Sequence, residues 1–152
     1  MRLADILRPD CVIPALSGGT IPSLLAELAA PVGAAAGIDP AVLSAALQAR
    51  EKLGSTGVGE GVAVPHCKAP RLGSLAASLG RVRAGVDFRS LDGKPTFLFF
   101  ALFAPERAGA EHLQALARVS RLLKRPELRQ ALLDAPDAAA MYRIVVDEDA
   151  KL

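Results

Sequence analysis

The sequence predicts an α/β protein in which a mixed central β-sheet is flanked by helices on both faces. Segments with helical apolar spacing are interspersed with short strand-like segments up to residue 103, and helical patterns then continue to the end of the chain. The run Thr96–Phe103 is continuously apolar, which is typical of a central strand covered on both sides. A length of 152 residues, 51% of them hydrophobic, suits one core, and no linker or repeat divides the chain. We therefore expect a single domain over residues 1–152.

The first part of the chain predicts a strand followed by a helix. Residues 11–16 form a short apolar segment, and Thr20 before Ile21 and Pro22 resembles a helix start, because proline is favoured in the first turn. Pro31 removes a helical hydrogen bond and clashes with the preceding turn. We therefore expect either a kink at this point or two separate helices.

A second helix is predicted from Asp39-Pro40, an N-cap residue followed by proline at the first helical position. Apolar residues continue at helical spacing towards Arg50, and Gly54 is the expected stop. Arg50 therefore lies in the last turn of this helix and faces the loop that follows.

Strands and a turn are predicted for the middle of the chain. The strands are expected over residues 61–64, 75–82 and 96–103, with a short extended piece over 86–88 and a turn at Asp92-Gly93. Three helices should follow, over residues 111–124, from Pro126 and from Pro136.

The glycine-rich stretch from Arg50 to His66 carries the chemistry of the chain. It contains a cation, the hydroxyls of Ser55 and Thr56, small-residue turns beginning at Gly57, and the imidazole of His66. Guanidinium and backbone N–H groups stabilise phosphate oxygens, and a neutral imidazole nitrogen can attack phosphorus. The pattern predicts phosphoryl transfer through a histidine.

Composition excludes other classes of protein. A net charge of +2 and 4% aromatic residues provide neither a basic stripe nor stacking groups, so no nucleic-acid partner is expected. The longest apolar run, Phe97–Ala104, is far shorter than the roughly 20 residues of a membrane helix, and the start of the chain lacks a signal-peptide pattern. The protein is expected to be cytoplasmic, without membrane insertion. Cys11 and Cys67 suit neither a disulfide framework nor a zinc site, and we expect reduced thiols, no metal and no cofactor.

Three short motifs carry a family resemblance: Arg50-Glu51-Lys52, Ser55-Thr56-Gly57 and Gly61-Val62-Ala63-Val64-Pro65-His66, followed downstream by Glu111-His112-Leu113. With them, the chain resembles the enzyme IIA domain of the fructose/mannitol class in the bacterial phosphoenolpyruvate-dependent phosphotransferase system. It is most similar to the nitrogen-regulatory IIA proteins. The resemblance implies a phosphocarrier whose His66 accepts a phosphoryl group, through Nε2, from a small histidine-containing phosphocarrier protein.

The resemblance also implies roles for the other residues. His112 would orient His66 or hydrogen-bond the phosphoryl oxygens, although it lies 46 residues further on (112 minus 66). Arg50 would offset charge on the phosphoryl group, and Ser55, Thr56 and Gly57 would bind its oxygens. Without the resemblance, His112 would read as a solvated helix-start residue and Arg50 as a favourable charge at a helix C-terminus.

Several readings of the function remain open at this stage. The nitrogen-regulatory resemblance implies phosphorylation-dependent binding to proteins such as sensor kinases or potassium-transport proteins. The alternative is a sugar-transport IIA that passes the phosphoryl group to a permease IIB. A binding module with an inactive site, and a cysteine hydrolase or redox enzyme built on Cys67 and His112, are weaker rivals. Cys67 stands where the family commonly has glycine, and Val62 and Val64 are expected on the apolar rim that partners contact.

Overall fold

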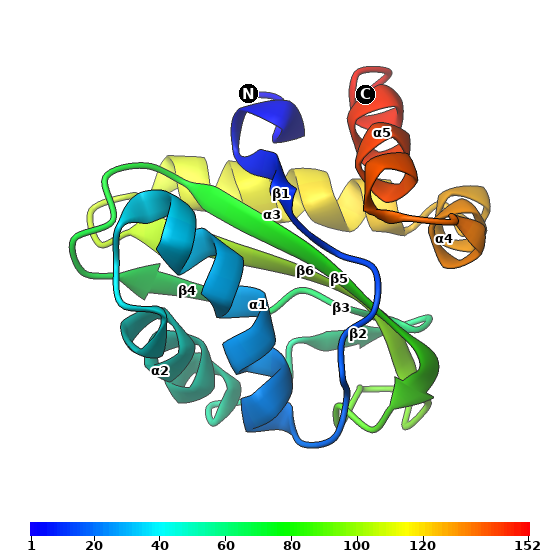
Figure 1. Ribbon diagram of the computed structural model, residues 1–152, viewed down its shortest axis with the longest axis horizontal. Helices are drawn as coiled ribbons and strands as arrows, with labels where there is room; N and C mark the ends of the chain where they lie inside the picture. Colours follow the sequence, from blue (N-terminus) through cyan, green and yellow to red (C-terminus); the bar gives the residue numbers. More distant parts are fainter.

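The computed structural model describes residues 1–152 and is built around one mixed six-stranded sheet (Figure 1). The strands are β1 (Leu7–Ile13), β2 (Gly57–Gly59), β3 (Val62–Ala63), β4 (His66–Ala69), β5 (Ala76–Val86) and β6 (Thr96–Pro105). Their order is β1-β5-β6-β3-β2, with β4 also beside β6. The pairs β5–β6 and β2–β3 are antiparallel, whereas β1–β5, β3–β6 and β4–β6 are parallel. The predicted mixed sheet is confirmed.

Helices cover both faces of this sheet, as the sequence predicts. They are α1 (Ile21–Ala36), α2 (Pro40–Glu51), α3 (Ala110–Leu123), α4 (Pro126–Asp134) and α5 (Ala138–Asp149), preceded by the short 3-10 helix η1 (Leu3–Asp5). On β5 the hydroxyl of Ser78 donates to the carbonyl of Leu28 in α1, whereas Arg81 donates to the carbonyl of Leu132 in α4. Because side chains of opposite parity leave a strand on opposite faces, α1 and α4 cover different sides of the sheet. In Figure 1, α1 and α2 lie in front of the sheet and α3 behind it.

The helix starts follow their capping residues. Thr20 accepts a hydrogen bond from the backbone N–H of Ser23, and Asp39 accepts one from the N–H of Ala41. Helix α1 runs through Pro31 without a break, so the expectation of two separate helices is wrong. Its buried apolar face packs on the core, and such packing supplies most of the stability of a helix inside a protein, enough to offset one lost hydrogen bond.

Three boundaries differ from the sequence predictions. Strand β1 begins at Leu7 and contains Pro9, which an edge strand tolerates because one side of its backbone needs no partner. The segment predicted over residues 86–88 is not a separate piece, since β5 extends to Val86. Helix α5 begins after Asp137, whose side chain accepts from the N–H of Ala140, rather than at Pro136.

The strand predicted over residues 61–64 is divided by proline. β3 covers only Val62–Ala63, and β4 resumes at His66 after Pro65. Pro65 has no N–H for a ladder, but its carbonyl accepts from the N–H of Leu102 in β6. His66 is therefore the first residue of a strand, not the last residue of the strand before it.

Two charged side chains lie inside the structure. Arg81, 1% exposed, donates to the carbonyls of Pro14, Leu132 and Ala135 and has no carboxylate partner. Asp149, also 1% exposed, pairs with Arg118 of α3 and accepts a hydrogen bond from the backbone N–H of Leu3 at 2.7 Å. Asp149 thus ties the C-terminal helix to both the start of the chain and α3, and both termini lie on the same side of the molecule in Figure 1.

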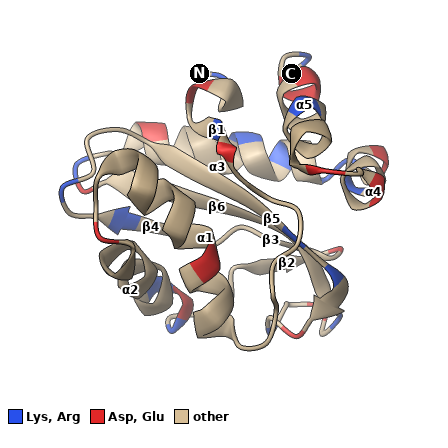
Figure 2. Ribbon diagram, in the orientation of Figure 1, with Lys and Arg blue, Asp and Glu red and all other residues tan.

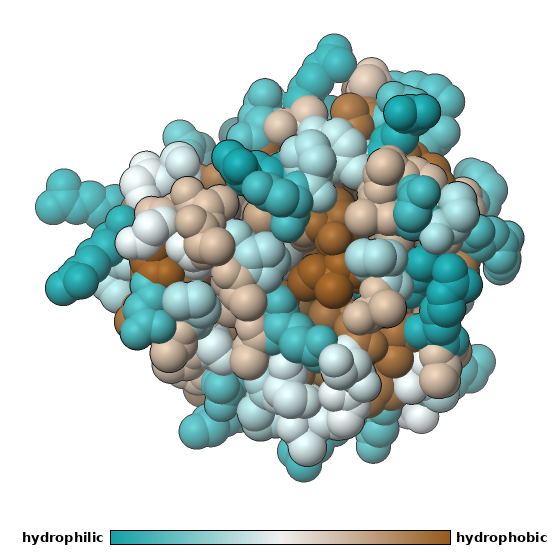
Figure 3. Space-filling view, viewed as in Figure 1, coloured by the Kyte–Doolittle hydropathy of each residue, from teal (hydrophilic) through white to brown (hydrophobic).

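The surface has no dominant charge. Lys and Arg alternate with Asp and Glu over the helices in Figure 2, and apolar side chains gather near the middle of the face shown in Figure 3, over the β1 and β5 part of the sheet. None of the helices combines the length and the apolar character required to span a bilayer.

Candidate functional site

His66 is held by its backbone and by one side-chain hydrogen bond. It opens β4, opposite Leu102 of the central strand β6, and its ring is partly exposed. Its Nδ1 lies 2.9 Å from the carbonyl oxygen of Val64. A carbonyl can only accept a hydrogen bond, so Nδ1 carries the proton and, in the neutral ring, Nε2 carries a free lone pair. The fold therefore fixes the tautomer in which Nε2 is the nucleophilic atom.

His112 lies beside this ring. It occupies the first turn of α3, and its ring centroid is 5.6 Å from that of His66, with 50° between the ring planes. The side chain is buried, and its Nδ1 has no hydrogen-bond partner. Burial lowers the pKa of His112, and the nearby His66 and Lys68 lower it further. His112 is thus held towards its neutral form, with one unused ring nitrogen.

The residues after His66 alternate between two environments. Because successive strand residues point to opposite faces, Lys68 shares the face of His66 and Cys67 points into the core. Lys68 is exposed, whereas Cys67 is buried and belongs to the hydrophobic core. Burial raises the pKa of the Cys67 thiol to about 12. The thiolate that a cysteine hydrolase needs is therefore strongly disfavoured, and Cys67 and His112 lie on opposite sides of the sheet.

Arg50 lies where the sequence predicts, in the last turn of α2. Its Nη1 donates to the carbonyl oxygen of Gly54 at 2.9 Å, and no hydrogen bond or ion pair joins it to another side chain. Helix α2 packs against β4, the strand that begins with His66. The guanidinium thus borders the loop that leads to the histidine and keeps most of its donors unused by the protein.

The hydroxyls of Ser55 and Thr56 already have partners within the loop. Ser55 donates to the carbonyl of Phe88 at 2.9 Å and accepts from the N–H of Gly57 at 3.0 Å. Thr56 is 4% exposed and donates two hydrogen bonds to the carboxylate of Glu51. Its hydroxyl donates at 2.6 Å and its backbone N–H at 2.8 Å. In this conformation these groups shape the loop, and their hydroxyl protons are not directed to a ligand.

The apolar surface near the site differs from the expectation. Val62 and Val64 are 2% and 4% exposed, so they belong to the core and do not form a rim. They lie in or beside the short strand β3, which is paired on both sides by β2 and β6. One apolar side chain that does reach the surface is Leu113, 68% exposed and next to His112 on α3; Leu53 and Val58, before β3, are exposed as well.

The structure thus brings together His66 and His112, which the sequence could link only through a family resemblance. Arg50 lies on the adjoining loop, whereas Ser55, Thr56 and Gly57 are engaged in its internal hydrogen bonds. Sequence reasoning missed the parts played by Glu51, which holds Thr56, and by Lys68. A charge two residues after His66 in a predicted strand would have indicated Lys68. No group of three or more His, Cys, Asp or Glu side chains is arranged to hold a metal ion.

This fold and this pair of histidines define a IIA-type component of the phosphotransferase system. Residues 5–148 match the family described as "Phosphoenolpyruvate-dependent sugar phosphotransferase system, EIIA 2", and the chain belongs to that family. A nitrogen regulatory protein of Bradyrhizobium diazoefficiens is 41% identical over 95% of this chain and 95% of its own. A fructose-specific EIIA component of Haloferax volcanii is 34% identical, over 88% of this chain and 85% of its own.

Solved structures agree with this assignment. The crystal structure of the nitrogen regulatory protein IIA-Ntr from Neisseria meningitidis superposes with a TM-score of 0.88 at 31% identity, covering 94% of this chain and 98% of that one. The fold and the family are therefore those that the sequence predicts, and the nitrogen regulatory proteins are among its relatives.

Proposed function

We propose that His66 is the phosphoryl acceptor of this chain and that a histidine-containing phosphocarrier protein is the donor. The observation that carries the proposal is the hydrogen bond from Nδ1 of His66 to the carbonyl of Val64, 2.9 Å long, which leaves the Nε2 lone pair free. In the transfer, Nε2 forms a bond to phosphorus while the P–N bond of the donor breaks, and the electron pair of that bond returns to the donor's imidazole. Nδ1 keeps its proton and continues to donate it to the carbonyl of Val64, so no base is needed.

His112 and Arg50 have supporting roles in this proposal. His112 contributes a ring nitrogen without a partner beside the acceptor ring, and a neutral imidazole can donate one hydrogen bond to a phosphoryl oxygen or orient His66. Arg50 offers guanidinium donors at the end of α2. Phosphoryl transfer depends mostly on positioning and on stabilising charge, which is what these groups supply. Ser55, Thr56 and Gly57 then act through loop shape.

The test is phosphorylation followed by intact mass measurement. Incubation with phosphoenolpyruvate and the upstream carrier proteins should add one phosphoryl group that is labile in acid and stable in alkali. His66→Ala should abolish the adduct without loss of helical circular dichroism, and Cys67→Ala, the neighbouring control, should retain it. An undiminished adduct in His66→Ala would refute the assignment.

The supporting groups are tested by rate. His112→Ala and Arg50→Ala should slow transfer by about 10²–10³-fold, the size of losing one preorganised stabilising group. Arg71→Ala is a matched control, since Arg71 is exposed and belongs to no part of this site. Wild-type rates in both site variants would show that the environment assigned to His66 is wrong.

The downstream role proposed here is regulation by phosphorylation-dependent binding. A phosphoryl group adds roughly −1.5 to −2 charges beside the exposed Leu113, and a partner that covers this surface should then be repelled. The unphosphorylated form would bind regulatory targets such as sensor kinases or potassium-transport proteins. The similarity to a fructose-specific EIIA component keeps transfer to a permease IIB as the second candidate.

The two roles predict different results in a pull-down that compares wild type with His66→Glu. Regulation predicts targets that are retained by the unphosphorylated wild type and lost by His66→Glu. Equal recovery of every protein by both forms would reject the switch. Transfer of labelled phosphoryl groups to a fructose-class IIB would favour the transport role.

A further inference from the structure

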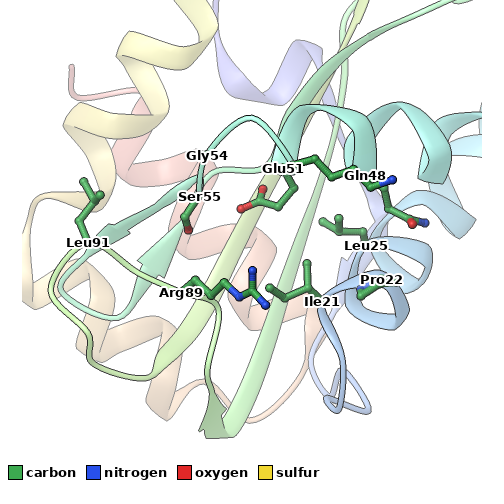
Figure 4. A pocket seen from close by; sticks show the side chains of 10 residues that line it. Ile21, Pro22, Leu25, Gln48, Glu51, Gly54, Ser55, Arg89 and Leu91 are labelled. Atoms are coloured by element: carbon green, nitrogen blue, oxygen red, sulfur yellow. The ribbon is translucent and has the colours of Figure 1, made fainter.

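A cavity lies beside the loop that leads from α2 to His66. It has a volume of about 560 Å³, within the range of roughly 300–1,000 Å³ that small-molecule sites occupy. The start of α1, the end of α2 and the loop after Phe88 form its walls, as Figure 4 shows. Neither His66, His112 nor Arg50 lines it. The cavity is therefore separate from the phosphoryl-acceptor site.

Two opposite charges face this cavity without meeting each other. In Figure 4 the carboxylate of Glu51 and the guanidinium of Arg89 both point into the open space, from α2 and from the loop after Phe88. No ion pair joins them or links either one to another charged side chain. The guanidinium of Arg89 makes no hydrogen bond, and each carboxylate oxygen of Glu51 accepts only one, from Thr56. Both groups thus retain capacity for a ligand.

The backbone holds Arg89 at this position. Its φ is 55°, in the left-handed region, and its N–H donates to the side chain of Asp87 at 3.0 Å. The preceding residue, Phe88, is fully buried and packs edge-on against Phe99 at 5.1 Å between ring centroids. These two contacts hold the loop at Arg89 in this conformation. The side chain of Arg89 therefore extends from a fixed position on the loop.

The remaining walls combine apolar residues with three further polar side chains, those of Gln48, Lys52 and Ser55. Ile21, Pro22 and Leu25 form the side made by α1, and Leu91 lies at the opposite end in Figure 4. Gln48 donates its amide N–H to Ser44, which leaves its side-chain oxygen as an acceptor. The cavity thus combines two basic residues, Arg89 and Lys52, with acceptors on α2 and an apolar wall, and these match a carboxylate, an ammonium group and a hydrocarbon side chain.

We propose that this cavity binds a free α-amino acid with an apolar side chain. Arg89 pairs with the carboxylate, Glu51 and the Gln48 oxygen accept from the ammonium group, and the side chain lies against Ile21 and Leu25. Glu51 also holds Thr56, so the occupied cavity contacts the loop that connects α2 to His66. The proposal does not depend on phosphorylation of His66.

The experiment uses L-leucine as the probe, titrated to millimolar concentrations into the full chain and followed by the amide NMR signals of Gly54, Ser55 and Leu91. Saturable shifts at these amides are expected. Arg89→Gln should weaken binding by about tenfold to a hundredfold, the effect of losing a charged hydrogen-bonding group. Arg71→Gln is the matched control, because Arg71 is also exposed, has a φ of 67° and lies outside the cavity. It should bind like wild type.

Two analogues separate the groups of the ligand. 4-Methylpentanoate has the carboxylate without the ammonium group, and isopentylamine has the ammonium group without the carboxylate. Both should bind at least about tenfold more weakly than leucine, since each leaves one charged partner in the cavity unused. The proposal is overturned if leucine causes no saturable shift, if Arg89→Gln binds like wild type, or if either analogue binds as tightly as leucine. None of these measurements involves phosphoryl transfer, so their outcome is independent of the role of His66.

Discussion

Replacing Arg81 with methionine should destabilise the fold by about 3–5 kcal/mol, because three carbonyls lose their donor and each buried group left without a partner costs about 1–3 kcal/mol. The guanidinium donates to the carbonyls of Leu132 and Ala135, at 2.7 and 2.8 Å, where α4 ends, and to Pro14 at 3.0 Å. Each charged hydrogen bond stabilises by about 1.5–3 kcal/mol, and burial of the cation offsets part of that sum. Such a loss is a large share of the roughly 5–15 kcal/mol by which domains are stable.

Urea unfolding followed by far-UV circular dichroism measures this loss, because the chain has no tryptophan and one tyrosine. Arg83→Met is the matched control: Arg83 is exposed and reaches the carbonyl of Ala135 only at 3.3 Å, so its loss should cost less than about 1 kcal/mol. If Arg81→Met does not fold, Arg81→Lys, which keeps a charge with fewer donors, should still show a clear loss. A free energy of unfolding within about 1 kcal/mol of wild type for both Arg81 variants would refute the reasoning.

Two further predictions concern titratable side chains. The pKa of His112 is lowered in the folded protein, so in acid the unfolded chain, where the ordinary value is 6.5, takes up the proton first. The contribution of neutral His112 to stability is therefore complete above pH 6.5 and is lost as the pH falls below that value. The free energy of unfolding, measured by urea titration at several pH values, should fall in acid for wild type and fall less for His112→Gln. The same pH dependence in both proteins would contradict this prediction. Because burial raises the pKa of Cys67 from 9.0 to about 12, alkylation by iodoacetamide near pH 8 should be about 10³-fold slower in the folded than in the unfolded protein. Labelling of native Cys67 at the unfolded rate, read by peptide mass, would be the contrary result.

Local signals predicted the elements that depend on neighbours in the chain. Thr20 and Asp39 cap α1 and α2 as expected, because capping depends on residues two or three positions away. Pro31 did not divide α1, since tertiary packing, which no local pattern contains, supports the helix. Pro9 was likewise compatible with β1 only because that strand lies at the sheet edge.

The site was predictable in part for similar reasons. His66 and Arg50 belong to one continuous motif, but the contact of His66 with His112 depends on where α3 crosses the sheet. The loop hydroxyls seemed suited to binding phosphate, yet Thr56 is held by Glu51 and Ser55 by Phe88, 33 residues further along the chain. Val62 and Val64 were expected at the surface, and pairing of β3 on both sides buries them. Partners distant in sequence decided these outcomes except that of Thr56, whose partner Glu51 lies five residues away.

The carboxylate of Asp149 determines how this domain can be tethered to others. It connects the last helix to Leu3 and to Arg118, so both ends of the chain lie on the same side of the molecule, beside the middle of α3. A polypeptide joined to either end would therefore emerge from the same side of the molecule, and two such extensions would begin next to each other.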